Sequence, residues 1–349
     1  MINIGINGLG RIGKSIFLQL FRKKDINICV INDINDFNID DIELYLKYDS
    51  SYIYDKNFDV EILSKNKLKI FHHEIILTSK KNPEDINWKG NGCNYVIDCS
   101  GKYDTVSECK KHNIDYLLIT TPSKDLDIPT YIYGFNDKLY NNESIISSSS
   151  CTINCLIPLL NIFNNNLGIK NAHYTFLHKI LGDQHTTDVF KKINYLNRST
   201  INNILPFEST SFKHIWNLIP SLKDKIFGLH YRIPITNSSI MELNISFDKI
   251  INKDELFKLL EENEYYKICF DINKKKLVSC DFINTEYPII IDYNLTKDMN
   301  NGNFYISIWY DNEWAYSSHV IRLLYSISNY HLDKLPKGLK RNIDSCYKT

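Results

Sequence analysis

The stretch Ile2-Asn3-Ile4-Gly5-Ile6-Asn7-Gly8-Leu9-Gly10-Arg11-Ile12-Gly13 decides the fold of the first part of the chain. Its first half is apolar and strand-like, and a helical pattern follows from about Arg11 to Phe21. Between them the glycines have the spacing G-x-G-x-x-G. The first glycine permits a tight turn, the second lets a pyrophosphate approach the backbone, and the third allows close helix packing. The stretch therefore predicts a strand, a dinucleotide-binding loop and a helix.

An acidic residue in the right place supports this interpretation. Asp33 lies 20 residues beyond Gly13, at the end of the second predicted strand. A carboxylate there accepts hydrogen bonds from a ribose diol and repels a 2′-phosphate, so NAD is preferred over NADP. A glycine-rich turn without a ligand is the simpler alternative. The expected cofactor-binding residues from this motif are Gly8, Gly10, Arg11, Ile12, Gly13 and Asp33.

Short apolar runs alternate with helical patterns through the first third of the chain. Such alternation is typical of a parallel sheet wound with helices on both faces, the Rossmann arrangement. The predicted strands are 3–7, 28–32, 95–98 and 116–120, the predicted helices are 11–21, 39–46 and 105–112, and a hairpin is expected over 60–78.

The pattern changes near residue 150. Longer alternating segments, 174–178, 228–233, 240–247 and 304–310, suit a sheet covered on one face. We therefore expect an α/β fold with a doubly wound NAD-binding domain and an α+β catalytic domain whose sheet is mostly antiparallel. Lys179 to Ile204 is predicted to be a long functional loop. The expected boundaries are 1–150 for the NAD-binding domain, 151–316 for the catalytic domain, a helix of about 317–335 that completes the first domain, and a loose tail over 336–349.

Composition excludes several classes of partner. The 349 residues carry 41 Lys and Arg against 41 Asp and Glu, so bulk charge indicates neither nucleic acid nor a membrane surface. No apolar run reaches the roughly 18 residues of a membrane span, and Met1 leads directly into a strand without a leader. Nine scattered cysteines predict reduced thiols. Cys151 and Cys155 are one helical turn apart and could together hold a metal, but no second Cys or His pair has zinc-ligand spacing, so no metal is expected. We expect a cytoplasmic protein with a small-molecule ligand.

Ser150-Cys151-Thr152-Ile153-Asn154-Cys155 is the segment most suggestive of chemistry. A Ser-rich strand end runs into an apolar helix there, which places the Cys151 sulfur at a helix N-terminus, where the thiolate and an oxyanion are both stabilised. His178 is a plausible base. A buried small apolar cysteine and a structural histidine are the alternatives for these two residues.

Several motifs together resemble the glyceraldehyde-3-phosphate dehydrogenase superfamily. They occur in the right order to about residue 330: Gly5-Ile6-Asn7-Gly8-Leu9-Gly10-Arg11-Ile12-Gly13, Ile31-Asn32-Asp33, Leu46-Lys47-Tyr48-Asp49-Ser50, Ser150 to Cys155, Arg232-Ile233-Pro234 and Trp309-Tyr310-Asp311-Asn312-Glu313-Trp314.

The resemblance implies an NAD-dependent aldehyde dehydrogenase. It implies Cys151 as the nucleophile, His178 as the base, and a homotetramer with the 179–204 loop at subunit contacts. It also implies that Asn312 lies near the nicotinamide carboxamide and Tyr316 lines the ring. Further cofactor contacts are implied for Lys81, Ser100, Gly101 and Thr120.

The segment after the base departs from the glycolytic members. From the histidine onward they have His-Ala-x-Thr-x-Thr-Gln, whereas this chain has His178-Lys179-Ile180-Leu181-Gly182-Asp183-Gln184. Both hydroxyls are lost and one position becomes a carboxylate, which repels a phosphate. The segment resembles D-erythrose-4-phosphate dehydrogenase, a resemblance that implies oxidation of erythrose 4-phosphate to 4-phosphoerythronate for pyridoxal phosphate biosynthesis.

Arg232 is the best candidate cation for a sugar phosphate, because a guanidinium offers bidentate contacts. A structural ion pair is its alternative role. Two other functions stay open: a divergent glycolytic glyceraldehyde-3-phosphate dehydrogenase, and a catalytically weak NAD-binding scaffold protein. The further candidate substrate contacts are Ser150, Thr152, Asp183, Arg198, Ser209 and Thr210.

Overall fold

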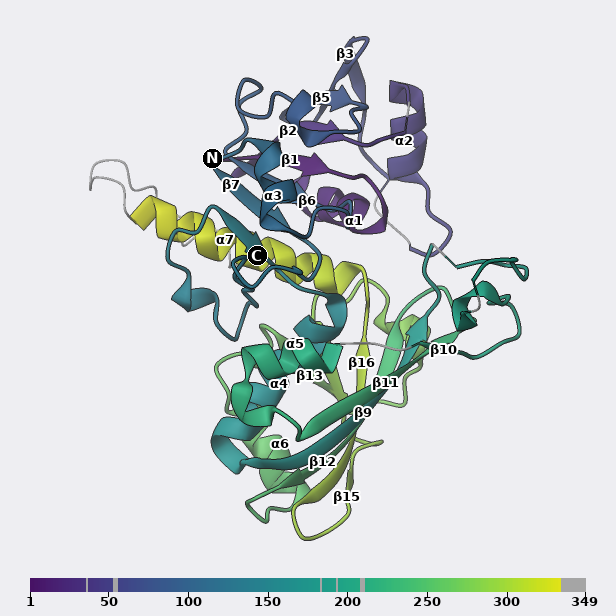
Figure 1. Cartoon of the computed structure of the whole chain (residues 1–349), viewed down its shortest axis with the longest axis vertical. Coiled ribbons are helices and arrows are strands. Elements are labelled where there is room, and N and C mark those ends of the chain that lie inside the picture. The colour runs from purple at the N-terminus through teal and green to yellow at the C-terminus, as the bar shows by residue number, and fades with distance from the viewer. Residues whose placement is uncertain (36, 53–55, 183, 193, 208–210, 334–349) are drawn as a thin grey trace.

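The computed structural model describes residues 1–35, 37–52, 56–182, 184–192, 194–207 and 211–333. Two sheets form two units, one above the other in Figure 1, and the long helix α7 (Trp314–Asp333) runs between them. Among the helices of these ranges, none has the combined length and apolar character that crossing a membrane requires.

The first unit has a sheet of strand order β3-β4-β5-β2-β1-β6-β7-β8. The strands from β5 to β8 in this order pair in parallel, and β3, β4 and β5 form an antiparallel meander at one edge. The expected hairpin over 60–78 is therefore three strands, because a second turn follows at Phe71, whose φ is 54°. The strands are β1 (Ile2–Asn7), β2 (Ile26–Asn32), β3 (Glu61–Ser64), β4 (Lys67–Ile70), β5 (His73–Thr78), β6 (Tyr95–Asp98), β7 (Tyr116–Ile119) and β8 (Ile145–Ser147).

Helices connect these strands as the sequence predicted. They are α1 (Arg11–Leu20), α2 (Ile39–Lys47) and α3 (Val106–Cys109), which continues as a 3-10 turn over Lys110–His112. Asn38 caps α2 reciprocally with Asp41, which explains why the helix begins there. Helix α7 packs Val320, Leu323 and Leu324 into the core of this first sheet.

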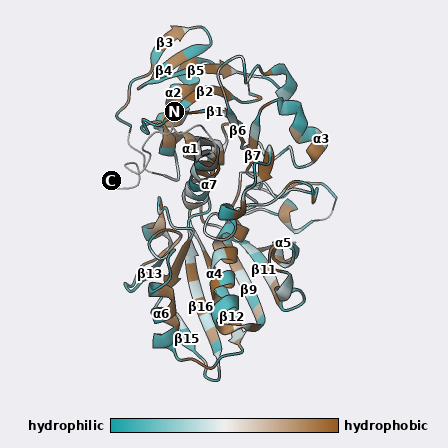
Figure 2. Cartoon of the chain, turned by 90° about the vertical axis from the view of Figure 1, so that its left-hand side faces the viewer, coloured by the Kyte–Doolittle hydropathy of each residue, from teal (hydrophilic) through white to brown (hydrophobic). Residues whose placement is uncertain are grey.

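The second unit has a mixed sheet of order β10-β11-β9-β12-β16-β14-β13, with β15 paired to β16. Hydrophobic and hydrophilic residues alternate along β9, β12 and β16 (Figure 2), and the apolar set faces α4 and the core beneath it. Most pairs are antiparallel, but β9 pairs with β11, and β13 with β14, in parallel. The strands are β9 (Ile169–Lys179), β10 (Leu205–Phe207), β11 (Ile226–Ile233), β12 (Ser239–Phe247), β13 (Phe270–Asn273), β14 (Ile289–Asp292), β15 (Lys297–Asp298) and β16 (Asn303–Tyr310); the helices are α4 (Cys151–Leu167), α5 (Ser211–Leu218) and α6 (Lys253–Glu261).

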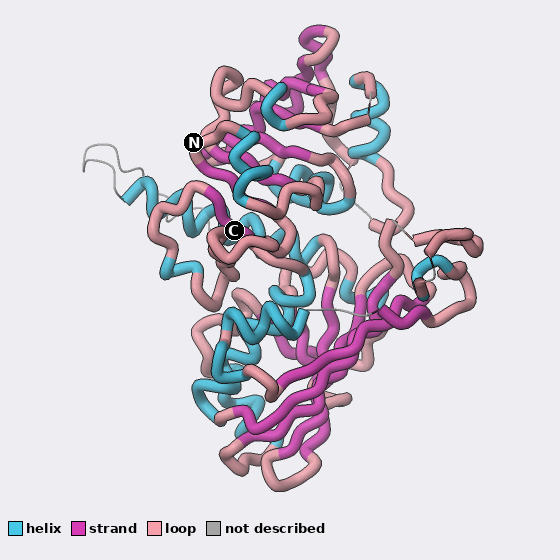
Figure 3. Tube along the Cα trace, viewed as in Figure 1, coloured by secondary structure: helices cyan, strands magenta, loops and turns pink. Residues whose placement is uncertain are grey.

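The predicted fold class is therefore confirmed: a doubly wound Rossmann unit and a second unit with a mostly antiparallel sheet. Between β9 and β10, the residues that the structure describes form loop apart from a 3-10 turn at Tyr195–Asn197 (Figure 3).

A buried cluster of charged side chains joins the two units. The Glu313 carboxylate, just before α7, pairs with Arg11 of α1 at 2.8 Å and with Lys179 at the end of β9. On the other side of Arg11, Asp49 pairs with Arg11 at 2.6 Å and with Lys14 at 2.9 Å. Burial alone would raise the pKa of Asp49, but the hydrogen bonds from Arg11 and Lys14 outweigh it and hold that pKa at about 2. Asp49 therefore stays ionised at neutral pH, and the ion pairs of the cluster link β9, α1 and α7.

We predict unequal losses when the Glu313 to Lys179 pair is broken from its two sides. Glu313→Gln leaves the buried Lys179 ammonium without its carboxylate and should cost about 3–5 kcal/mol of unfolding free energy. Lys179→Met should cost less, because Glu313 keeps Arg11 as a partner. Chemical denaturation at pH 7 measures both. Equal losses, or no loss for Glu313→Gln, would contradict this description of the cluster.

Candidate active site

The glycine loop has two glycines that the fold needs and one that leaves space. Gly8 has φ +91°, and a Cβ on it would lie 2.9 Å from the Ser100 nitrogen. A Cβ on Gly13 would lie 2.0 Å from the Gly8 carbonyl oxygen. At Gly10 no heavy atom lies within 4 Å of an added Cβ. Gly13 is therefore needed for close packing of helix α1 against the loop. Gly10, by contrast, leaves the open space that a pyrophosphate requires.

A pocket of about 300 Å³ lies beside this loop. Its residues combine apolar rings and chains with a carboxylate, the composition that suits an adenine ring and its ribose; they are Leu9, Gly10, Asp33, Asn35, Phe37, Asp41, Ile42 and Tyr45. Asp33 accepts from the Leu9 nitrogen at 2.8 Å through one oxygen and from Asn35 through the other. Asp33 therefore shapes the loop and faces the pocket, and the residues present fit a dinucleotide.

The other predicted cofactor residues lie around the ends of the first sheet's strands. Ser100 donates to Asp98 at 2.7 Å, and Thr120 donates to the Asp98 carbonyl at 2.9 Å, so both follow β6 and β7. Gly101 has φ +66° and open space around it, and Lys81 is exposed beyond β5.

Arg11 and Ile12, also predicted as cofactor residues, direct their side chains elsewhere. The Arg11 guanidinium is held in the ion cluster, and Ile12 packs against the core of the first sheet. Any contact of these two residues with a pyrophosphate therefore falls to their backbone N–H groups at the start of α1.

Cys151 begins α4 and packs against the hydrophobic cores of both units. The chain enters the helix through Ser149, whose φ of 59° makes the sharp turn after β8. Ser150 caps the helix by accepting from the Ile153 nitrogen. Asn154 braces the turn from inside, since its side chain donates to the Ser148 and Ser150 carbonyls at 2.7 and 3.0 Å. The sulfur is thus held at a rigid helix N-terminus.

Two tyrosines from the end of β16 and the start of α7 surround this turn. The Tyr316 hydroxyl donates to the Ser149 carbonyl at 2.9 Å, so this buried residue supports the Cys151 turn. Burial raises the pKa of Tyr310 well above its usual value, and the negative charge of a nearby Cys151 thiolate raises it further. Tyr310 therefore stays protonated beside the sulfur.

His178 is buried at the end of β9. Its Nδ1 lies 2.7 Å from the Lys179 carbonyl oxygen, and its Nε2 lies 2.8 Å from Asn312 Nδ2. Burial lowers the pKa of His178 well below its usual value, and the positive charge of Arg232 lowers it further. The imidazole is therefore neutral at pH 7 and can accept a proton without first losing one. The contact places the predicted cofactor residue Asn312 directly on His178, the predicted base.

The predicted cations take different positions. Arg232 lies opposite His178 in the β11 to β9 register, is 6% exposed, and stacks over Phe207 at 4.8 Å. Arg198 pairs with Asp188 at 2.7 Å in the exposed loop, and among the described residues no hydrogen bond or ion pair joins it to His178.

The remaining predicted substrate contacts divide into two groups. Ser150 and Thr152 lie in the first turn of α4 beside Cys151. Asp183, Ser209 and Thr210 lie outside the described residues.

Sequence reasoning missed four residues of this site: Tyr310, Ser239, Lys179 and Glu313. Alternation along β16 could have shown that Tyr310 faces inward with Phe304, Ile306 and Ile308. The contacts of Lys179 and Glu313 join residues 134 apart in sequence and had no local signal.

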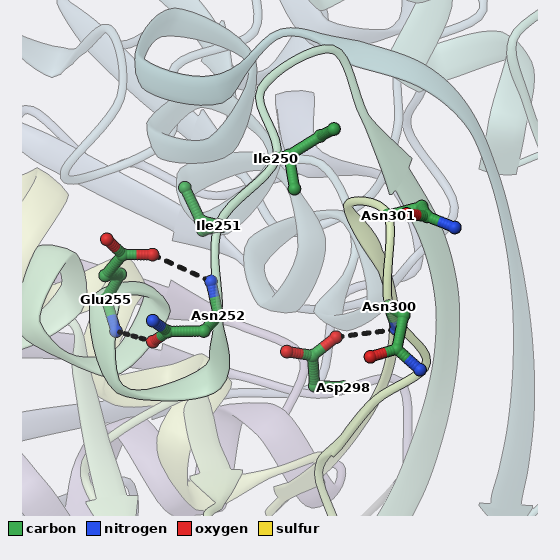
Figure 4. Close-up of a pocket in the computed structure, with 7 residues that line it drawn as sticks. All are labelled: Ile250, Ile251, Asn252, Glu255, Asp298, Asn300 and Asn301. Carbon is green, nitrogen blue, oxygen red and sulfur yellow. Dashed lines mark hydrogen bonds between the residues drawn. The ribbon is translucent and has the colours of Figure 1, made fainter.

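A second pocket, of about 380 Å³, lies at the far end of the second unit between the start of α6 and the β15–β16 turn (Figure 4). Its carboxylates serve local structure: Glu255 and Asn252 cap α6 reciprocally, and Asp298 accepts from the Asn300 nitrogen. In the described part of the chain, no three His, Cys, Asp or Glu side chains gather as a metal group, and the eight described cysteines are free.

We predict that two glycine substitutions separate folding from cofactor binding. Gly13→Ala should cost about 1–3 kcal/mol of stability without any ligand, because its Cβ meets a backbone oxygen. Gly10→Ala should change stability by less than about 0.5 kcal/mol. It should nevertheless weaken NAD binding at least about tenfold, because its Cβ enters the open space. Denaturation and NAD titration measure these effects, and normal NAD affinity in Gly10→Ala would refute the placement.

Comparison with known proteins agrees with this geometry. Residues 2–106 match the family model "Glyceraldehyde 3-phosphate dehydrogenase, NAD binding domain", and residues 150–312 match "Glyceraldehyde 3-phosphate dehydrogenase, C-terminal domain". Three relatives are named glyceraldehyde-3-phosphate dehydrogenase. The protein from Buchnera aphidicola is 32% identical over 93% of this chain and 98% of its own. That from Colletotrichum lindemuthianum is 31% identical over 95% and 99%, and the second such enzyme of Staphylococcus aureus is 31% identical over 91% and 94%. NAD is thus the cofactor, and the chain belongs to the glyceraldehyde-3-phosphate dehydrogenase family as an NAD-dependent oxidoreductase that acts on an aldehyde.

Proposed function

We propose that this dehydrogenase oxidises the aldehyde of a short phosphorylated sugar through a thioester on Cys151, with His178 as the base. The observation that carries the proposal is the state of His178: a neutral imidazole at the end of the sheet next to the Cys151 helix. Tyr310 links Cys151 to His178. It lies beside Cys151 and pairs in register with Ser239. Ser239 in turn contacts Asn312, which lies on His178.

The chemistry follows from these positions. The Cys151 thiol adds to the aldehyde carbon, and the negative charge that develops on the aldehyde oxygen lies at the N-terminus of α4, where first-turn N–H groups stabilise it. The thiol proton ends on this oxygen, which gives a hemithioacetal hydroxyl. His178 Nε2 then takes the hydroxyl proton as the carbonyl re-forms. Bound NAD supplies the acceptor for the hydride. The product on the protein is a thioester, and attack by water or phosphate breaks the carbon–sulfur bond and restores the thiol.

Arg232 is the proposed anchor for the substrate's phosphate. It is a buried guanidinium on the strand next to the base, and its charge also disfavours a charged His178. A bound phosphate dianion would offset this positive charge, so substrate binding and base strength are coupled.

D-erythrose 4-phosphate is the aldehyde that we propose, with water as the acceptor and 4-phosphoerythronate as the product. After His178 and Lys179 the described chain continues with Ile180, Leu181 and Gly182, which offer no side-chain hydroxyl to a phosphate. A sugar one carbon longer places its phosphate farther from the reacting carbon, so it depends less on donors at these positions.

Glyceraldehyde 3-phosphate is the second candidate, with inorganic phosphate as the acceptor. The names of the relatives, 28–32% identical along most of the chain, favour it. Both candidates use the same cysteine, base and cofactor, so only the substrate and acceptor separate them.

We also propose a cytoplasmic homotetramer. Two relatives, from Dianthus caryophyllus and Sinapis alba, are named as cytosolic. Support for assembly comes from the open face of the second sheet and the loop beyond β9, where apolar side chains face outward. Phe227 and Leu229 of β11 are 47% and 50% exposed, and Phe190 of the loop is fully exposed.

An NADH assay with both aldehydes, each with and without inorganic phosphate, tests the substrate proposal. We predict faster oxidation of erythrose 4-phosphate, with a rate that does not depend on phosphate. Cys151→Ser should abolish turnover, because a serine hydroxyl is a far weaker nucleophile than a thiolate. Cys155→Ser is the matched control one turn along α4 and should stay active. Activity only with glyceraldehyde 3-phosphate and phosphate would establish the second candidate instead.

A further inference from the structure

Four buried residues form a closed chain of hydrogen bonds around the base. Starting from the Lys179 backbone, the Lys179 nitrogen donates to Ser239 Oγ at 3.1 Å, and Ser239 Oγ donates to Asn312 Oδ1 at 2.7 Å. Asn312 Nδ2 contacts His178 Nε2, and His178 Nδ1 contacts the Lys179 oxygen. The exposed fraction of each of the four is 4% or less, so water does not compete for these bonds.

The two ends of this chain of hydrogen bonds determine which atom donates and which accepts at every step. A carbonyl oxygen can only accept, so His178 Nδ1 must carry the proton. In a neutral ring Nε2 is then bare, and Asn312 must present its amide nitrogen to it. The Asn312 oxygen therefore faces Ser239, whose own oxygen accepts the Lys179 N–H. Each donor has one acceptor, and no orientation is left undetermined.

This arrangement has a consequence for catalysis. A ring nitrogen has one lone pair, and Asn312 occupies the lone pair that would take the substrate's proton. A hydrogen bond to the neutral form of a base also disfavours its charged form.

We propose that Ser239 is a positioning residue: in the protein without bound ligands it anchors Asn312 so that the amide nitrogen covers the Nε2 lone pair of His178. The inference rests on the proposed function, in which this lone pair is the base.

Other charged and titratable groups face His178 as well. Arg232 and His230 come from β11, and Lys179 comes from β9 itself, where Glu313 pairs with it. All three bases disfavour a charged imidazole. On the β12 side, Ser239 is uncharged. A substitution there changes hydrogen bonding around His178 without changing the charge, so its effect on the titration of His178 can be assigned to the anchor.

The chain offers a matched control on the same strand. Ser246, at the other end of β12, donates to Asn303 Oδ1 of β16 at 2.6 Å. This bond also runs from a serine hydroxyl to an asparagine oxygen, but it is remote from the site. Ser239→Ala and Ser246→Ala each remove a hydrogen bond from a serine hydroxyl to an asparagine oxygen. Only Ser239→Ala also removes the acceptor of the Lys179 N–H, and only Ser239 lies on the chain of bonds that reaches His178. Asn312→Ala removes the donor itself and serves as the positive reference.

The test is the titration of His178, followed by nitrogen NMR on histidine-labelled protein without aldehyde, with His178→Asn to assign the signal. Ser239→Ala should raise the pKa of His178 by about half a unit or more, Asn312→Ala at least as much, and Ser246→Ala by less than about 0.2 units. The acid limb of kcat/KM, which reports the free enzyme, should move with the Ser239→Ala shift.

An unchanged His178 titration in Ser239→Ala, with a shift in Asn312→Ala, would overturn the anchoring role. So would equal shifts in Ser239→Ala and Ser246→Ala. A wild-type protein that oxidises neither aldehyde would count against the proposed function, and the NMR titration would still decide the role of Ser239.

Discussion

The contacts of the β16–α7 turn, Asp311 to Trp314, hold both the fold and the site together. Glu313 pairs across the molecule with Arg11 and Lys179. Asn312 contacts the base, and Asp311 accepts from Tyr52 and from the Glu313 and Trp314 nitrogens, which fixes the turn before α7. Consecutive residues of this turn therefore position Arg11 beside the glycine loop, His178 at the end of β9, and helix α7 between the units.

Burial makes this turn both costly and specific. A buried carboxylate with two cations close to it is stable only in one arrangement, because losing a partner leaves a charge in an apolar setting. The same burial keeps His178 neutral and Tyr310 protonated. The structural cluster and the chemical groups share this buried region, so a displacement of the turn would disturb stability and the site together.

Local patterns were enough to predict much of the fold and the place of Cys151 at the start of a helix. Gly8 to Gly13, the strand before them and the helix after them are specified by neighbouring residues, and so is the start of α4 at Cys151. Strands β13 and β14 were missed: β13 alternates apolar and polar residues over only four positions, and β14 carries no such alternation. Helices α5 and α6 are short and were also missed. Contacts such as Ser239 with Asn312 depend on strand register, which no single segment encodes.

The central claim is that Cys151 carries the oxidised substrate as a thioester. The most direct test mixes the protein with NAD and aldehyde, quenches it in acid within the first turnover, and locates the added mass by peptide mass spectrometry. One acyl group per chain is expected on the peptide that contains Cys151, formed together with NADH and absent from Cys151→Ser. An acyl group on another cysteine, or NADH formation with no adduct at any time, would contradict it.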